Sequence, residues 1–495
     1  IREGRFPLWN PHEFLGMPFV ANLQSAMFYP LNWLCAVLPL GRAINLGIML
    51  GLFLAGFFTY LWGRRLGLSR AGALAAAGVY VFSAPQILRV HEGHWSFLAP
   101  LTWIPCVLLC VEALLDGGSW PLAVAGGAVA VAMQWFGGNP QYAFYGGIGA
   151  AAWLAARLWA EHCAPRRAAW RVAAGFGFFY FLGTLLASAQ VLPALEMFAH
   201  SARGERVSLG WVSQYSLVPE NLLTFLVPGF FGEGSGVGAE YWGRWNLWET
   251  CAYCGIVALG LAALGAWRGA SSKAWAALAV AGLLLLLALG PYTPLLRMLY
   301  AAVPGFDLFR ALGRFLGPMA LFVALLAGLG MDRLTSGDGG PPRVWLFLCR
   351  GLAVVLVAGG GLLLLSPGGE VWSGFMGWIS GVGRGSRPFF IRETVTPEFA
   401  VIAGRTAGLG LLWAGWLIGG LAILCAPAWR ARVRPWLAPA ALALLAVDAA
   451  AFARPYMQSV DPRADGITPG AAAALRQEAQ PLRYARGTAL GLPSG

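Results

Sequence analysis

Charged side chains are scarce in this chain. Of its 495 residues, 11% are charged and 58% are hydrophobic. A soluble protein of this length would need far more charge to cover its surface. The scarcity therefore excludes a soluble globular protein and predicts an all-α polytopic membrane protein.

Lysine is almost absent: Lys273 is the only lysine among 34 basic residues, and the other 33 are arginines. The formal net charge of the chain is +12. The arginines are spread over many loops and do not form a basic stripe with interleaved aromatic residues, as a nucleic-acid-binding surface would. We therefore expect no nucleic-acid partner and interpret the positive charge as a marker of membrane topology.

Several familiar signatures are also missing. The sequence has no Gly-rich phosphate loop after a strand, no GxSxG and no HExxH motif. Its eight cysteines fall mostly inside apolar runs, which is typical of small buried hydrophobes and not of a disulfide framework. Nucleotide-driven chemistry is therefore not expected. No signal peptide is visible, and we expect the chain to be cut at both Ile1 and Gly495.

Apolar runs long enough to span a membrane, about 17 to 25 residues each, are abundant. There are about twelve of them, near residues 43–63, 71–88, 96–115, 120–136, 141–158, 170–192, 248–267, 274–290, 311–331, 344–365, 402–425 and 436–453. We therefore predict about twelve transmembrane helices, in a six-span bundle over residues 43–192 and a second one over residues 248–453.

Arginine is distributed unevenly among the connecting loops. Short loops rich in arginine alternate with loops that hold little, and the positive-inside rule places the arginine-rich set in the cytoplasm. The long loops then all fall outside: residues 1–42, 193–247, 291–310, 366–399 and the tail 454–495. Short amphipathic pieces at residues 28–38, 217–227 and 293–303 predict interfacial helices within these outer loops.

Residues 6–32 combine aromatic side chains with several Asn and Gln side chains. Aromatic residues such as Trp9 and Phe28 are costly to leave in water, whereas Asn22 and Gln24 are costly to leave in lipid. This mixture fits the membrane–water boundary. We interpret the stretch as the floor of a site that opens at one face of the membrane.

Ionic residues gather near the outer ends of the predicted spans. Arg310 and Arg314 stand four residues apart, so we expect them to share a helix face and to grip a phosphate or pyrophosphate by bidentate hydrogen bonds. The alternative is headgroup contact, or an ion pair with Asp307 or Glu249. Glu249 and Tyr253 are expected to share a face at the start of the seventh span, where Glu249 either joins the site or pairs with an arginine.

Four further residues are candidates for substrate binding. His94 follows His91 in HxxH spacing, which is weak evidence for a metal site because a third ligand is needed. If His94 is functional, we expect it to form a hydrogen bond with a sugar or phosphate of the substrate. The alternative is a structural role as an interfacial cap. Asn139 and Gln141 lie in a tight outer turn and can bind hydroxyl groups, although Asn-Pro is also a common turn. Arg203 follows the sixth span, where it either binds substrate or pairs with Glu196.

Seven segments together resemble the YfhO-like bacterial membrane proteins, a family similar to the GT-C class of glycosyltransferases. They are GRFPLWNPHEFLGMPFVANLQSAMFYPLN, GHWSFLAPLTWIPCVLL, GNPQYAFYGG, SAQVLPALEMFAHSAR, PENLLTFLVPGFFG, ETCAYCGIVAL and PGFDLFRALGRF, in this order. The resemblance runs over essentially the whole chain. It implies a GT-C-like enzyme of the bacterial cytoplasmic membrane, with its active site facing outside.

Such an enzyme transfers a sugar from a polyprenyl-phosphate carrier to a cell-envelope glycan or glycolipid. The resemblance implies a catalytic acid in the first outer loop, which should lie shortly before Ile1, so the catalytic residue is unknown here and this fragment is expected to be inactive. It also implies that residues 454–495 begin a truncated extracytoplasmic domain. The sequence assigns no metal ligands. Whether the activity requires a divalent metal is left open.

The main alternative is a transporter or flippase for a lipid-linked or polar substrate. Transporters place ionisable residues and broken helices near the membrane midplane, often in repeated halves. Here the ionic residues lie at one rim and no internal repeat is evident. These two features favour the transferase.

Overall fold

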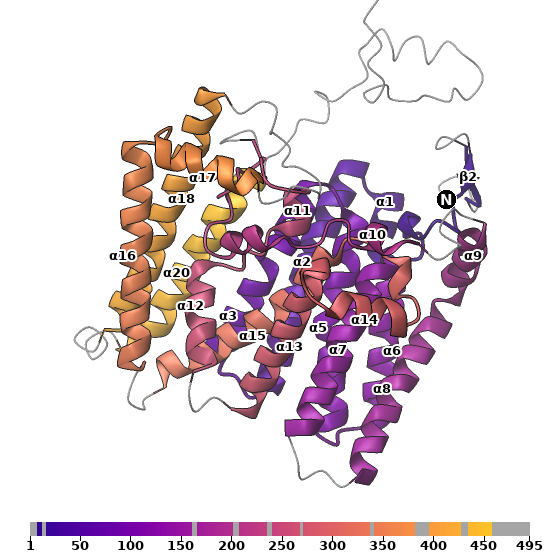
Figure 1. The fold of residues 1–495 in the computed structure, drawn as a ribbon. Coiled ribbons are helices and arrows are strands. Elements are labelled where there is room, and N and C mark those ends of the chain that lie inside the picture. Colours follow the sequence, from indigo (N-terminus) through magenta and orange to yellow (C-terminus); the bar gives the residue numbers. More distant parts are fainter. Residues whose placement is uncertain are drawn as a thin grey trace, which may run out of the picture.

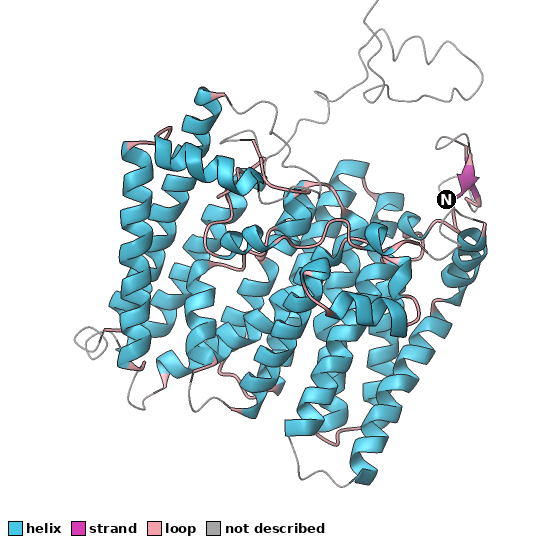
Figure 2. Ribbon diagram, viewed as in Figure 1, coloured by secondary structure: helices cyan, strands magenta, loops and turns pink. Residues whose placement is uncertain are grey.

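The computed structural model describes residues 7–11, 16–160, 166–200, 207–234, 240–267, 271–336, 341–381, 396–426 and 434–457. Arg203 and nearly all of the predicted extracytoplasmic tail, 454–495, lie outside these residues. The described chain is mostly helical, with one two-stranded antiparallel sheet near the N-terminus (Figure 2). In that sheet β1 (Trp9–Asn10) pairs with β2 (Met17–Pro18).

The helices fall into three length groups. The long ones are α2 (Leu40–Arg65), α5 (Trp95–Leu115), α6 (Trp120–Phe136), α7 (Pro140–Ala160), α8 (Arg166–Leu186), α13 (Ser272–Ala288), α15 (Leu316–Thr335), α16 (Arg343–Leu365), α18 (Pro397–Leu424) and α20 (Leu437–Ala453). The intermediate ones are α3 (Arg70–Val81), α4 (Ala84–His91), α9 (Ser188–Ala199), α12 (Ile256–Gly265), α14 (Leu295–Ala302) and α17 (Glu370–Gly381). The short ones are α1 (Leu34–Val37), α10 (Leu209–Val212), α11 (Leu247–Thr250) and the 3-10 turns η1 (Leu23–Ser25), η2 (Pro30–Trp33), η3 (Pro219–Phe225), η4 (Gly290–Tyr292), η5 (Phe306–Leu308), η6 (Leu312–Phe315), η7 (Arg434–Trp436) and η8 (Arg454–Tyr456).

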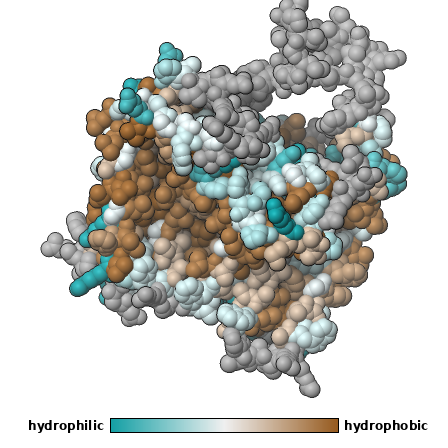
Figure 3. Space-filling model, in the orientation of Figure 1, coloured by the Kyte–Doolittle hydropathy of each residue, from teal (hydrophilic) through white to brown (hydrophobic). Residues whose placement is uncertain are grey.

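Seven helical segments of the described chain are long and apolar enough to cross a membrane. They are Leu40–Arg65, Trp95–Leu115, Ala169–Leu186, Leu312–Thr335, Arg343–Leu365, Pro397–Leu424 and Arg434–Tyr456. The pair α3 and α4, bent by 40° at its break, makes an eighth if it counts as one span. Apolar side chains such as Phe347 and Leu365 of α16 are exposed, and brown apolar surface covers the side of the molecule where α16 and α18 lie (Figure 3).

Twelve spans are not confirmed, although each predicted range contains a helix. α6 and α13 have only 17 residues each, and α7 is long enough but is not among the seven. The range predicted near 248–267 is broken: α11 ends at Thr250, and α12 begins only at Ile256 after Gly255, whose φ is 100°. Glu249 and Tyr253 therefore do not share a helix face, contrary to expectation.

α15 lies at the centre of the helix bundle. In the most apolar 18-residue stretch of this helix 89% of the residues are buried, against 17% in that of α16. α15 packs on α3, α12 and α13 (Figure 1). A Cβ atom at Gly330 would lie only 1.8 Å from the carbonyl oxygen of Leu261 on α12. Small residues allow such close approach of two helix backbones, so glycine sets the distance between these helices.

Three of the loops expected on the cytoplasmic side meet at one end of the bundle. The side chain of Arg65 pairs with Asp116 at 2.9 Å, which joins the end of α2 to the α5–α6 turn. Lys273 Nζ donates to the Leu66 carbonyl at 3.0 Å, which adds the start of α13. The short interfacial helices expected at residues 28–38, 217–227 and 293–303 correspond to η2 with α1, to η3 and to α14.

Candidate functional site

Glu249 is the centre of a buried polar cluster. Arg89 Nη2 donates to its Oε2 at 2.5 Å, and Arg314 Nη2 donates to its Oε1 at 2.8 Å. The side chains of Arg89 and Glu249 are 1% and 5% exposed. Because charge-assisted hydrogen bonds to a carboxylate are strong and directional, the three residues fix the relative positions of α4, α11 and η6.

Gly313 allows this arrangement. A Cβ atom at this position would lie 2.3 Å from the Glu249 carbonyl oxygen and 2.9 Å from that of Tyr215. Any side chain here would push η6 away from α11. The glycine thus lets Arg314, the next residue, reach the Glu249 carboxylate.

Arg310 and Arg314 do not share a helix face, contrary to expectation. Ala311 adopts the left-handed conformation with φ 64°, and the 3-10 turn begins only at Leu312. The Arg310 guanidinium instead lies 5.3 Å from the ring centre of Trp211 and donates to Gln214 Oε1 at 3.3 Å. The i to i+4 rule failed here because the backbone between the two arginines is not helical.

Gln141 links the two arginines in another way. Arg314 Nη1 donates to Gln141 Oε1, while Gln141 Nε2 donates to the Arg310 carbonyl. Both ends of the Gln141 amide are therefore engaged within the cluster. Asn139 lies at the start of α7, where its Oδ1 accepts from the Tyr142 amide at 3.0 Å, so it shapes the helix start and has no direct bond to Glu249.

His94 borders the same cluster and is half-buried. Its Nδ1 lies 3.3 Å from Arg89 Nη1. A guanidinium can only donate, so Nδ1 accepts and the proton of the neutral ring is on Nε2. Burial, together with the charge of Arg89, lowers the pKa of His94 to about 4. His94 is therefore a neutral hydrogen-bond donor at pH 7.

Phe97 forms an aromatic floor beneath these groups. The guanidinium carbons of Arg89 and Arg314 lie 4.9 and 4.6 Å from its ring centre, and the His94 ring stacks on it at 4.8 Å. Cations are attracted to such ring faces. Phe97, in the first turn of α5, thus contacts two positive charges and the His94 ring.

The charge balance of the cluster is positive. Burial would raise the pKa of Glu249, but the charges and hydrogen bonds of Arg89 and Arg314 outweigh it and hold this pKa at about 2. Two guanidinium groups therefore face one carboxylate, and Arg310 adds a third positive charge nearby. Such a site favours an anionic ligand.

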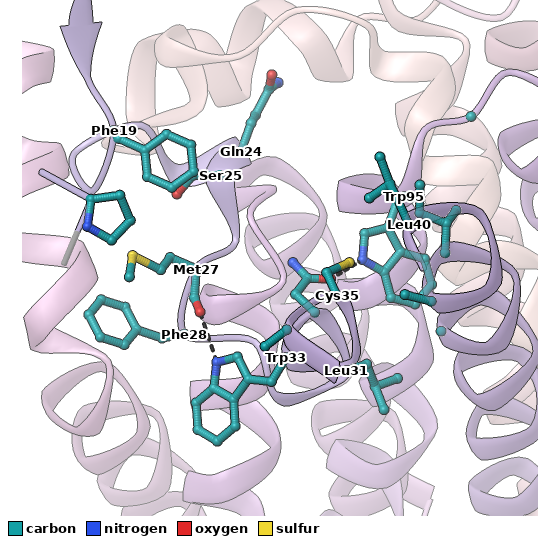
Figure 4. Close-up of a pocket in the computed structure, with 17 residues that line it drawn as sticks. Phe19, Gln24, Ser25, Met27, Phe28, Leu31, Trp33, Cys35, Leu40 and Trp95 are labelled. Carbon is teal, nitrogen blue, oxygen red and sulfur yellow. Dashed lines mark hydrogen bonds between the residues drawn. The ribbon is translucent and has the colours of Figure 1, made fainter. Parts of the chain in front are cut away.

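A cavity of about 1180 Å³ lies next to this part of the chain (Figure 4). Its lining includes Gly93 and Trp95, the two neighbours of His94, and otherwise comes mostly from residues 7–36 and the first turns of α2. Trp33 Nε1 donates to the Met27 carbonyl at 3.0 Å and so ties the wall together. Of the described part of residues 6–32, Pro7, Phe19, Gln24, Ser25, Met27, Phe28, Leu31 and Asn32 line this cavity.

Arg89 is a member of the cluster that the sequence did not single out as a site residue. The available signal was its position as the one arginine of a short outer loop. Of the predicted set, His94, Gln141, Glu249 and Arg314 come together, Arg310 lies beside them, and Asn139 is peripheral. His91 and His94 have different partners: His91 Nδ1 lies 3.2 Å from the Tyr456 carbonyl, whereas His94 Nδ1 contacts Arg89. Among the described residues, no group of three or more His, Cys, Asp or Glu is placed to hold a metal ion.

Comparisons with known proteins add no relative. None of the family models, curated proteins or solved structures compared with the chain matches it. The chemistry of the site is therefore inferred from its residues and their geometry.

Proposed function

We propose that this chain is a YfhO-like membrane glycosyltransferase that moves a sugar from a polyprenyl-phosphate carrier to an envelope glycan or glycolipid. It would work on the outer face of the bacterial cytoplasmic membrane. The observation that carries the proposal is the net positive cluster around Glu249 beside a large, mostly apolar cavity. An anionic lipid needs both parts, because its phosphate seeks cations and its isoprenoid chain seeks apolar walls.

The residues divide the binding task in this proposal. Arg314, 16% exposed, and the Nε2 donor of His94 hold the phosphate. Trp95, Leu31 and Ile44 line the space for the chain. When the sugar leaves, negative charge grows on the phosphate, and a fixed guanidinium stabilises that charge in the transition state.

The general base is not assigned to this cluster. A transferase needs a group that accepts the proton of the acceptor hydroxyl. Glu249, with a pKa of about 2, is a weak base, and His94 already uses Nδ1 to accept from Arg89. The proposed roles of both residues are therefore in binding and positioning.

The experiment measures transfer of labelled sugar from a polyprenyl-phosphate donor to envelope acceptors by the full-length protein. Arg314→Lys keeps the charge but cannot contact both Gln141 and Glu249 through a planar fork. We expect a fall of about ten- to a hundredfold, the value of a lost charged hydrogen bond. Arg297→Lys, on the exposed face of α14, is the matched control and should retain the wild-type rate. Equal rates for both variants would remove Arg314 from the site.

A transporter or flippase is the second candidate, because two helices are broken. α3 and α4 meet at a 40° bend, and residues 251–255 are unwound ahead of α12. Half-helices of this kind bind substrates in transporters. Reconstituted vesicles separate the two functions: movement of a lipid-linked sugar across the bilayer without cleavage of the sugar–phosphate bond would support the transporter and contradict the transferase.

A further inference from the structure

A second cavity, of about 560 Å³, lies on another part of the molecule and borders α18. Its walls come from α18, from the segment 226–233 and from the end of α20 with η8. We call it the α18 cavity. Ile402, Leu409 and Trp413 line it and are 49%, 60% and 44% exposed, so the cavity opens onto an apolar face of α18, one of the seven helical segments apolar enough to cross a membrane.

Arg405 is the only arginine or lysine that lines the α18 cavity. It is exposed, and within the described chain no ion pair or hydrogen bond to its side chain is present. A charged residue in a spanning helix normally pairs or reaches the headgroup level. Arg405 lies at the level where α16 ends, which fits the headgroup level. The preceding Gly404 is so close to the turn after α16 that a Cβ atom on it would lie 2.1 Å from the carbonyl oxygen of Pro367, two residues beyond the last residue of α16.

Glu233 brings the opposite charge to the same cavity. It is half-buried, and it forms no ion pair with Arg405 or with another described residue. Burial raises the pKa of Glu233, as expected for a half-buried carboxylate with no ion pair in the described chain. The cavity therefore presents one cation and one anion that are each unsatisfied by the protein.

We infer that the α18 cavity binds a phospholipid whose headgroup carries both a phosphate and a primary ammonium, as in phosphatidylethanolamine. The phosphate pairs with the Arg405 guanidinium, the ammonium donates to the Glu233 carboxylate, and the acyl chains lie along Ile402, Leu409 and Trp413. A purely anionic lipid would place its charge near Glu233 without compensation. This inference is independent of the proposed transferase, whose cluster is built on α4, α5, α7, α11 and η6.

Native mass spectrometry of the purified full chain tests the inference. Phosphatidylethanolamine, phosphatidylglycerol and phosphatidylcholine are added separately at equal concentration. We expect the ethanolamine lipid to be retained best, because phosphatidylcholine has no N–H donor and phosphatidylglycerol has no cation. Equal retention of the three lipids by the wild-type protein would overturn the proposal.

Two variants separate the two contacts. Arg405→Gln should lower retention of phosphatidylethanolamine about tenfold, as expected for loss of a charged hydrogen bond. Glu233→Gln should abolish the preference for phosphatidylethanolamine over phosphatidylglycerol while lipid is still bound. Arg350→Gln, an exposed position on α16, is the control, and unchanged helix content shows that each variant is folded. Wild-type lipid binding by Arg405→Gln, or an unchanged preference in Glu233→Gln, would refute the corresponding contact.

Discussion

Arg89 of α4 donates directly to Glu249 of α11, although 160 positions separate the two residues in the sequence. Arg314 completes the arrangement from a third segment. All three side chains are largely buried. The polar cluster therefore holds distant parts of the chain together as well as presenting positive charge.

Glu249→Gln should destabilise the protein strongly. The change leaves the Arg89 charge buried without a counterion, and breaking a buried pair in this way typically costs about 3–5 kcal/mol. Chemical denaturation in detergent, followed by circular dichroism, measures the loss. Glu196→Gln, at an exposed position of α9, is the control and should change little. A loss below about 1 kcal/mol for Glu249→Gln, the range of exposed pairs, would show that the pair does not support the fold.

Acidification should destabilise the protein through His94. The folded-state pKa of His94 is lowered from 6.5 to about 4 by burial and by Arg89, so the unfolded chain binds a proton first as the pH falls. The stability contribution is complete above pH 6.5 and is lost as the pH falls to about 4. His94→Asn should make the thermal unfolding midpoint depend less on pH over this window. His200→Asn, at an exposed position, should leave the pH dependence of the midpoint unchanged. An identical slope for wild type and His94→Asn would contradict the geometry.

Glu112 and Arg157 form a second buried ion pair at 3.2 Å, and Trp153 Nε1 also donates to Glu112. Replacing either charged residue by leucine should cost about 3–5 kcal/mol, whereas replacing both together should cost far less than the sum. A double-mutant cycle from denaturation midpoints measures the coupling. The exposed pair Arg65 and Asp116 is the reference and should couple by less than about 1 kcal/mol. Additive losses at Glu112 and Arg157 would contradict a direct pair.

Gly330→Ala should destabilise the contact between α15 and α12, because its Cβ would meet the Leu261 carbonyl. Gly282→Ala, in α13, has open space around it and should be neutral or stabilising by up to about 1 kcal/mol, the helix propensity difference. Thermal unfolding of both variants gives the comparison. An equal or higher midpoint for Gly330→Ala would show that the two helices do not approach so closely.

The sequence predicted the helix positions well, because apolar runs and their boundaries are local features. Each predicted span range contains a helix, and the short helix α14 occurs where amphipathic spacing placed one. The number of spans was less predictable, since the break at residues 251–255 depends on how the chain packs. The α12 start is capped from afar: Val257 N donates to Asp448 Oδ2 at 3.1 Å.

The site was predictable only in part. Ion pairing of Glu249 with Arg314 was one of the alternatives, because charged residues near span ends need partners. The turn at Ala311, whose φ is 64°, was missed because alanine normally favours a helix. Its amide donates to the Gln214 carbonyl at 2.8 Å, a long-range contact that local sequence does not reveal. The sequence did not reveal the ion pair of Arg157, which lies in the last turn of α7 as a buried partner of Glu112.

Binding of polyprenyl phosphate to the purified chain tests the central claim most directly. Gly47 lines the cavity and its Cβ would touch Trp95, whereas Gly41, on the same helix, faces open space. We predict saturable binding of polyprenyl phosphate by the wild type and Gly41→Leu, weaker binding by Gly47→Leu, and little binding of the uncharged polyprenol. Equal binding of the alcohol and the phosphate, or full binding by Gly47→Leu, would contradict an anionic carrier site in this cavity.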